Sequence, residues 1–386
     1  AQAALLILVA AAPFSAMIGL TFPLGARLYA GSIEADARPV GRLYAAEAVG
    51  FLVGGLAYTF VLLTRLSAFG VLEVVMAVLC AAMVSVCVGL HRGKPCPAFL
   101  GVIAALAMVL GGAVGWRSAE WDQATRMGRW AGLAPSPGCR LVRVVDTPYQ
   151  NVMLSEYDGL YTVYANGQTC VSFPDPYQSG LEANFVLLQH PSPRRVLLLG
   201  WGAEGLIQEM LKSPLELIDY VQVDEGLLRA VEAFLAPGDR AALASPRVHV
   251  HHVDARVYVQ HARDRYDVVF ANVGDPSTAA LNRYFTTEFF EEVRRILAPG
   301  GVFATRVSSA VNVVGEEIGL HTGAVYHSLR QVFPHVLVTW DTANYLFATE
   351  ERGVLSADPQ VIGRRFQKRG IITEYFSDAH PEILLP

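Results

Sequence analysis

The chain has 386 residues and a formal net charge of −5, and 53% of its residues are hydrophobic while 17% are charged. This length exceeds that of one ordinary domain, and the apolar content is high for a soluble protein. The negative net charge gives no basic surface for nucleic acid, which excludes that class of partner. The apolar excess lies before residue 117, so we place the main domain boundary there.

The first 116 residues contain four apolar runs, at 3–22, 43–63, 70–90 and 98–116. Each has about the 20 residues that a helix needs to cross a membrane. We therefore predict about four transmembrane helices in an integral membrane protein of a bacterial inner membrane, in contact with lipid. Because residue 1 already lies inside an apolar run, we expect further spans before it. Arginines occur in loops on both sides, so the side that holds the rest of the chain stays undetermined.

A linker is predicted at 117–139, and the pattern then alternates with period two. Apolar alternation predicts short strands at 140–145, 151–156, 161–165 and 168–172. Asp158-Gly159 and Asn166-Gly167 separate some of these runs, and such pairs are typical of tight hairpin turns. Residues 140–175 are therefore predicted to form a small antiparallel β-unit.

Residues 176–350 show the alternation of strands and helices that is typical of a Rossmann-like, methyltransferase-type α/β domain. The predicted strands are 195–199, 218–223, 248–252, 266–271, 301–307 and 335–339, and the main helices 204–212, 225–235, 286–297 and 315–332. A C-terminal tail, 351–386, is predicted to form a helix and an extended arm. The predicted fold is thus an N-terminal helical membrane segment, a small β-unit and a Rossmann-like domain.

A nucleoside pocket is predicted where the strands of this sheet end. The run 196–199 leads into Gly200, Gly202 and Gly205, which suit a tight turn, the approach of a ligand and close packing of a helix. Gln222 follows about twenty residues later, where such folds bind a ribose. Further polar side chains follow later strands, namely Asp224, Asp254, Asn272 and Asp275.

No metal site is predicted. His249 and His251 lie on one face of a predicted strand, but no third ligand stands at a suitable spacing. The five cysteines also lack metal-type spacing. Cys139 and Cys170 are compatible either with a disulfide or with two free thiols.

Several runs resemble the spermidine synthase family of polyamine aminopropyltransferases over about residues 140–350. They are 146–152 (Asp-Thr-Pro-Tyr-Gln-Asn-Val), 161–168, 176–178, 190–197, 266–269, 274–276, 285–290 and 297–302. The first 116 residues resemble the membrane half of fused, transporter-like members, chiefly through 21–24 and 41–45.

The resemblance implies transfer of an aminopropyl group from decarboxylated S-adenosylmethionine to putrescine, which leaves methylthioadenosine. These nucleosides are the implied ligands, and no covalently bound cofactor is expected. By the same resemblance, Gln150 lies near the nucleoside and Asp254 recognises the adenine amino group. Tyr177 and Asp275 match the diamine-site residues of the family.

Three family acids are replaced in this chain, by Ala203, Gln222 and Asn272. Glu204 follows Ala203, and its direction is left open. Asn272 stands where the family has its general base, and an amide does not accept a proton at neutral pH; losing a base typically costs roughly 10²–10⁴-fold in rate. We therefore expect a catalytically impaired relative that serves as a structural or assembly subunit beside other membrane-protein subunits. The alternative is an active aminopropyltransferase with a polyamine substrate and Asp275 as its base.

Overall fold

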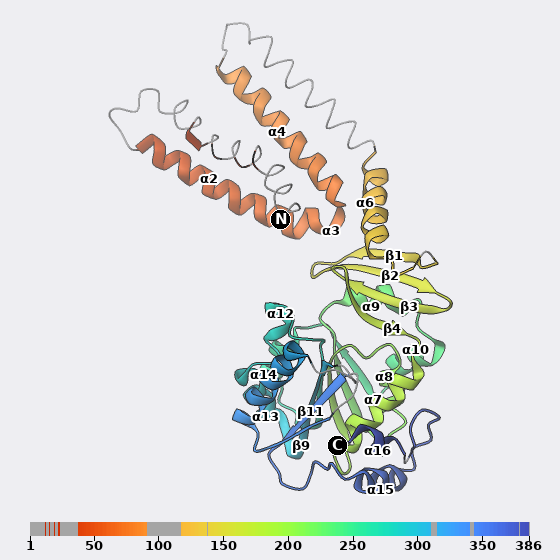
Figure 1. The fold of residues 1–386 in the computed structure, drawn as a ribbon. Coiled ribbons are helices and arrows are strands. Elements are labelled where there is room, and N and C mark those ends of the chain that lie inside the picture. The colour runs from red at the N-terminus through yellow and green to blue at the C-terminus, as the bar shows by residue number, and fades with distance from the viewer. Residues whose placement is uncertain are drawn as a thin grey trace. The chain divides into compact units, whose positions relative to one another are not determined.

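The computed structural model describes residues 38–90, 117–136, 138–309, 315–339, 343–377 and 379–385, together with a few isolated positions before residue 38. The chain divides into two compact units, Ala1–Arg129 and Trp130–Pro386 (Figure 1). The second unit contains the predicted nucleoside pocket.

The first unit is helical in its described part. Helix α2 (Arg38–Ala57) continues through the π-helical turn η1 (Tyr58–Leu62) into α3 (Leu63–Arg65), and α4 (Ala68–Leu90) follows. By length and composition, one described helix is suited to cross a membrane: Val40–Leu62, with a mean hydropathy of 1.7 and no buried residues. The apolar helix Phe69–Ala82 is shorter than a membrane span requires.

The expectation of about four transmembrane helices is therefore corrected to one candidate in the described residues. This candidate coincides with the predicted span 43–63, and the predicted span 70–90 falls on α4. The predicted spans 3–22 and 98–116 lie outside the described residues, apart from isolated positions. A second correction concerns 117–139, because Ser118–Leu133 form helix α6 where a linker was predicted.

A small antiparallel sheet begins the second unit. Its strands lie in the order β1 (Arg140–Asp146), β2 (Asn151–Tyr157), β3 (Leu160–Ala165) and β4 (Gln168–Phe173). Asp158 and Asn166 adopt φ of 50° and 49°, and the glycines after them also have positive φ, as a two-residue turn between twisted strands requires. One face packs on Trp130 of α6 through Met153 and Tyr164.

A seven-stranded sheet forms the centre of this unit. Its order is β10-β11-β9-β8-β5-β6-β7. The strands are β5 (Arg195–Gly200), β6 (Leu217–Val221), β7 (Val248–His251), β8 (Tyr266–Asn272), β9 (Leu297–Ser308), β10 (His335–Val338) and β11 (Ala343–Thr349). Strands β7, β6, β5, β8 and β9 are parallel, β11 runs antiparallel to β9, and β10 runs antiparallel to β11. The sequence pattern did not predict β11, which inserts between β9 and β10.

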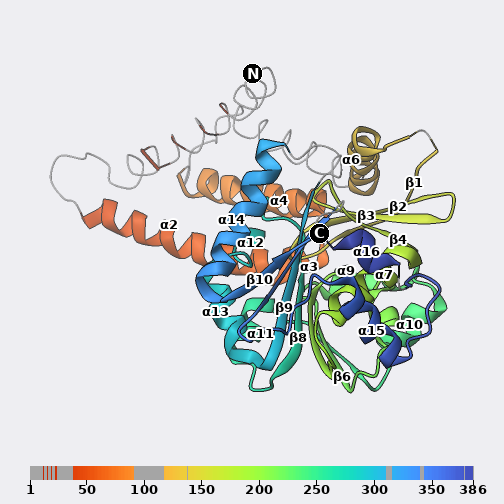
Figure 2. The ribbon, with the colours of Figure 1, turned by 60° about the horizontal axis from the view of Figure 1, so that its bottom comes forward.

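Helices cover both faces of this sheet, with α13 and α14 on one side and α7, α10 and α15 on the other (Figure 2). Their bounds are α7 (Pro176–Leu188), α8 (Leu206–Met210), α9 (Glu225–Glu232), α10 (Pro237–Leu243), α11 (Ala255–His261), α12 (Ala279–Asn282), α13 (Thr287–Ile296), α14 (Glu316–Val332), α15 (Pro359–Arg369) and α16 (His380–Leu384). Strand β5 shows why the residues fold this way. Val196 and Leu198 enter one core while Leu197 and Leu199 enter the other, as the period of two in a strand requires.

Candidate functional site

The glycine loop joins β5 to α8, and its backbone favours glycine at two positions and leaves little room for a side chain at a third. Gly200 and Gly205 have φ of +96° and +110°. A Cβ at Gly200 would lie 2.3 Å from the Asn272 carbonyl oxygen, and one at Gly202 would lie 2.4 Å from Leu198 Cδ2. The tight turn and the close packing that the sequence predicts are therefore present. Gly202, which was predicted to let a ligand approach, lies close to the side chain of Leu198.

Asn272 holds this loop against the end of β8. The Trp201 N–H donates to the Asn272 carbonyl at 2.9 Å, and Asn272 Nδ2 donates to the Trp201 carbonyl at 3.1 Å. Arg306 Nε on β9 donates to Asn272 Oδ1 at 2.9 Å. Both ends of the amide are thus used, and one of them donates a hydrogen bond that an ionised aspartate cannot donate.

A cavity of about 230 Å³ lies beside the loop, and we call it the inner cavity. Strand β4, the first half of α7, the glycine loop and the ends of β8 and β9 supply its walls. Its polar lining residues are Cys170, Ser172, Asp175, Gln178, Ser179, Glu182, Glu204, Asn272 and Arg306. Trp201 also lines it, so the indole narrows the cavity.

Glu182 and Arg306 form a buried ion pair at this cavity. Arg306 Nε lies 3.4 Å from Glu182 Oε1, which also accepts from the Tyr345 hydroxyl at 3.0 Å. The carboxylate of Glu182 raises the pKa of the Arg306 guanidinium, and burial raises that of the Tyr345 phenol. The sequence did not predict this pair, although Gln178 and Glu182 on α7 follow its N-cap Asp175 at helical spacing.

Glu204 also points into the protein and lines the inner cavity. Its residue is 8% exposed, and Oε2 accepts from the Gly202 N–H at 3.1 Å. Burial raises the pKa of this carboxyl group to about 7, against the lowering effect of loop N–H groups. The structure thus settles the direction that the sequence left open.

The predicted nucleoside residues Gln150 and Gln222 meet at the ends of β5 and β6. Gln150 Nε2 and the Thr147 hydroxyl donate to Asp224 Oδ2, at 3.0 and 2.8 Å. Gln222 Nε2 donates to the Gly200 carbonyl at 3.2 Å. Asp224 also caps α9 through the Leu227 N–H at 3.0 Å. The structure therefore brings these residues together as a network that fixes the strand ends.

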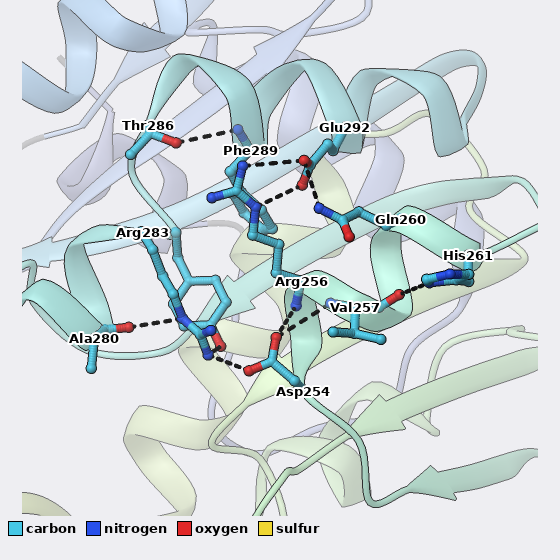
Figure 3. Close-up of polar contacts among 11 residues, drawn as sticks. Asp254, Arg256, Val257, Gln260, His261, Ala280, Arg283, Thr286, Phe289 and Glu292 are labelled. Atoms are coloured by element: carbon cyan, nitrogen blue, oxygen red, sulfur yellow. Dashed lines mark hydrogen bonds and ion pairs between the residues drawn. The ribbon is translucent and has the colours of Figure 1, made fainter. Parts of the chain in front are cut away.

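Asp254, the predicted adenine-binding residue, is held from two sides (Figure 3). Its Oδ1 accepts from the N–H groups of Arg256 and Val257, at 3.0 and 3.3 Å, and so caps α11. Its Oδ2 forms an ion pair with Arg283, whose guanidinium also lies 4.7 Å from the Tyr284 ring. The adenine amino group that was predicted to bind Asp254 would therefore have to compete with Arg283 for this carboxylate.

Tyr177 and Asp275 are not among the described residues that line the inner cavity. Tyr177 is 54% exposed, and its ring lies 6.1 Å from that of His380. It occupies another face of α7 than Gln178 and Glu182. Asp275 Oδ1 accepts from the Ser308 N–H at 2.7 Å. The assignment of these two side chains to a diamine site stays a prediction.

Among the described residues, no group of three or more His, Cys, Asp or Glu is arranged to hold a metal ion. His249 and His251 instead face Asp219 Oδ1, at 3.7 and 2.8 Å, and Tyr266 donates to Asp219 Oδ2 at 2.8 Å. Cys139 and Cys170 are free thiols.

Comparison with known proteins now bears on this geometry. Residues 175–338 match the spermine/spermidine synthase domain. Polyamine aminopropyltransferase 2 of Hyperthermus butylicus is 30% identical over 168 residues, which cover 42% of this chain and 55% of the relative. The polyamine aminopropyltransferase of Corynebacterium efficiens is 27% identical over 321 residues, which cover 79% of this chain and 59% of the relative. The chain thus spans little more than half the length of these two relatives.

Solved structures show the same fold. A spermidine synthase in complex with the transition-state analogue AdoDATO has a TM-score of 0.55 at 20% identity, over 64% of this chain and 85% of that one. Spermidine synthase from Thermotoga maritima has a TM-score of 0.53 at 19% identity, over 64% of this chain and 84% of that one. The Rossmann-like prediction is confirmed, and the match of residues 175–338 to the spermine/spermidine synthase domain supports the resemblance of this part of the chain to the spermidine synthase family.

Proposed function

We propose that this protein is an active aminopropyltransferase, which moves the aminopropyl group of decarboxylated S-adenosylmethionine to a diamine such as putrescine and releases methylthioadenosine. The proposal is supported by the domain match and by relatives that are named polyamine aminopropyltransferases. These findings favour the active enzyme over the impaired subunit that the sequence suggested first.

The observation that carries the proposal is the acidic lining of the inner cavity beside the glycine loop. Asp175, Glu182 and Glu204 line it, against Arg306 as the cationic member of the described lining. An aliphatic amine is cationic at neutral pH, and opposite charges attract strongly where water is excluded. The cavity therefore suits an amine substrate.

The donor fits beside this cavity, at the carboxyl ends of the strands, where open α/β sheets bind their ligands. In this proposal the ribose binds near the glycine loop, Gln150 and Gln222, and Asp254 accepts a hydrogen bond from the adenine amino group once Arg283 is displaced. The apolar helix Val40–Leu62 supports a membrane location for the full protein, with lipid as a partner.

One observation favours the impaired subunit of a membrane complex as a second candidate. Asn272 occupies the position of the family's base, and its amide is bound on both sides by Trp201 and Arg306. In this second candidate the inner cavity keeps its shape but has no general base at position 272.

Product analysis separates the two candidates. The detergent-purified full chain would be incubated with decarboxylated S-adenosylmethionine and putrescine, and methylthioadenosine and spermidine would be measured by mass spectrometry. Calorimetric titration with methylthioadenosine would run in parallel. We expect micromolar nucleoside binding and equal amounts of both products. Binding without product for any diamine or polyamine would favour the subunit, and absence of both would contradict the proposed function.

A further inference from the structure

Glu204 lies on the wall that separates two cavities. A groove of about 480 Å³, which we call the outer groove, is lined by the start of α7, by α8 and by residues 372–375. Asp175, Ser179 and Glu204 line both the inner cavity and this groove. Glu204 therefore belongs to the lining of both spaces.

Glu204 is buried without a cationic partner among the described residues. In the part of the chain that the structure describes, no Lys, Arg or His forms an ion pair with Glu204. The hydrogen bond that its carboxylate accepts from the Gly202 N–H joins two residues of the same loop. Burying a carboxylate without a cation costs free energy, which a structural residue at this position would avoid.

The groups that face Glu204 come from every neighbouring element, and most are acidic or neutral. In the outer groove they are Asp175 before α7, Asp239 on α10, Glu209 on α8, Lys212 after α8, and Glu374 and Tyr375. Tyr220 on β6 and Cys170 on β4 also lie near Glu204, and Glu182 on α7 and Arg306 on β9 line the inner cavity. Both cations already have partners, because Lys212 is paired with Glu209 and Arg306 is bound to Glu182 and Asn272. The surroundings are therefore ready to receive a cation, and the substrate amine is the cation that the proposed function supplies.

We propose that Glu204 is the proton acceptor of this site, in place of the base that Asn272 cannot provide. The inference rests on the proposed function. The Glu204 carboxylate takes a proton from the ammonium group of the acceptor amine. The freed nitrogen lone pair then forms the C–N bond to the propyl carbon, while the C–S bond breaks and its electron pair goes to sulfur, giving a neutral thioether. The positive charge of the sulfonium ends on the new secondary amine.

The titration of Glu204 agrees with this role. Burial raises the pKa of its carboxyl group to about 7, and a general base works best when its pKa lies near the operating pH. A stronger acid, such as an exposed glutamic acid, takes a proton from an ammonium group less readily. Below pH 7 the carboxyl group is protonated and cannot accept, so the rate is expected to fall there.

The first test compares the wild-type full chain with Glu204→Gln and with Glu216→Gln as a control. Glu216 forms an exposed pair with Arg194 and lines neither cavity. We expect Glu204→Gln to lose roughly 10²–10⁴-fold in kcat and to lose the limb of the pH–rate profile near pH 7. The Glu216→Gln variant should keep both. An unchanged rate and profile in Glu204→Gln would overturn the proposal.

A second measurement is independent of turnover. Spermidine would be titrated calorimetrically at pH 7, with methylthioadenosine bound, in buffers of different ionisation enthalpy. A bound ammonium group favours the ionised form of a nearby carboxyl group, so the wild type should release protons on binding and Glu204→Gln should not. Equal proton release in both proteins, or no spermidine binding to the wild type, would overturn the proposal. Proton release that depends on Glu204 in a protein without turnover would instead contradict only the proposed function.

Discussion

Arg283 forms an ion pair with Asp254, the carboxylate that the sequence assigned to adenine (Figure 3). The other oxygen of Asp254 accepts the first N–H groups of α11. The cap keeps this carboxylate in place, whereas the pair with Arg283 must open if a nucleoside amino group is to bind there. Binding of a nucleoside amino group would therefore leave the helix cap intact but break the ion pair with Arg283.

Replacing Arg283 with alanine is expected to tighten methylthioadenosine binding. The side chains of Arg283 and Asp254 are 41% and 25% exposed, and such ion pairs are worth about 0.2–1 kcal/mol. The dissociation constant should fall by up to about fivefold, as measured by calorimetry. Arg229→Ala removes an exposed pair with Glu225 and serves as the control. Weaker binding to Arg283→Ala would mean that the guanidinium contacts the ligand.

Restoring the missing acid at position 272 is expected to destabilise the domain. Asn272→Asp removes the hydrogen bond from Nδ2 to the Trp201 carbonyl and leaves two oxygens facing each other. An unsatisfied buried acceptor costs about 1–3 kcal/mol, although Arg306 can still pair with the new carboxylate. Urea unfolding of the variant would measure the loss. Unchanged stability together with increased turnover would show that the loop needs no amide.

The same reasoning applies to Gln222, whose Nε2 donates to the Gly200 carbonyl. Gln222→Glu also removes a donor from the loop. Restoring acids at 203, 222 and 272 together therefore removes two of the hydrogen bonds that hold the loop.

The stability of the domain should fall as pH rises from about 4.5 to about 7. Burial raises the pKa of Glu204 in the folded state from 4.5 to about 7, so the folded state binds more protons than the unfolded state in this range. Stability is therefore lost as the pH rises, by a total of about 3 kcal/mol for this one group. Glu204→Gln should flatten the curve and be the more stable protein at pH 8. Parallel curves for both proteins, from thermal unfolding, would contradict this.

Local patterns predicted most of the second unit. The alternation along β5 and the turn at Asn166-Gly167 depend on residues that are neighbours in sequence, so the sequence pattern predicts them directly. Helix α6 and strand β11 were missed, because their burial depends on contacts with distant residues.

The site was predictable only in part, for a related reason. The glycine loop and Asp254 belong to short motifs, whereas the pair of Glu182 with Arg306 joins a helix and a strand that are 124 positions apart. The pair of Arg283 with Asp254 likewise depends on where the segment before α13 folds. A sequence pattern carries no information on such pairs unless both partners belong to one motif.

The C-terminal helix α15 is expected to be essential for stability because two of its arginines cap α7. The last carbonyl groups of a helix lack partners within it. Arg365 Nη1 donates to the carbonyls of Leu188 and Gln189, at 2.9 and 2.7 Å, and its Nη2 donates to Val354 at 2.8 Å. Arg369 Nη2 donates to the Leu187 carbonyl at 3.0 Å.

Arg365→Met keeps much of the apolar contact but removes the donors, and hydrogen bonds to charged groups are worth about 1.5–3 kcal/mol. We expect the free energy of unfolding to fall by about this amount in urea titrations. The matched control is Arg364→Met, because Arg364 is exposed on the same helix and its loss should change stability by less than about 0.5 kcal/mol. Equal stability of the two variants would show that α7 needs no cap from α15, and its carbonyl groups would then have to be satisfied by water.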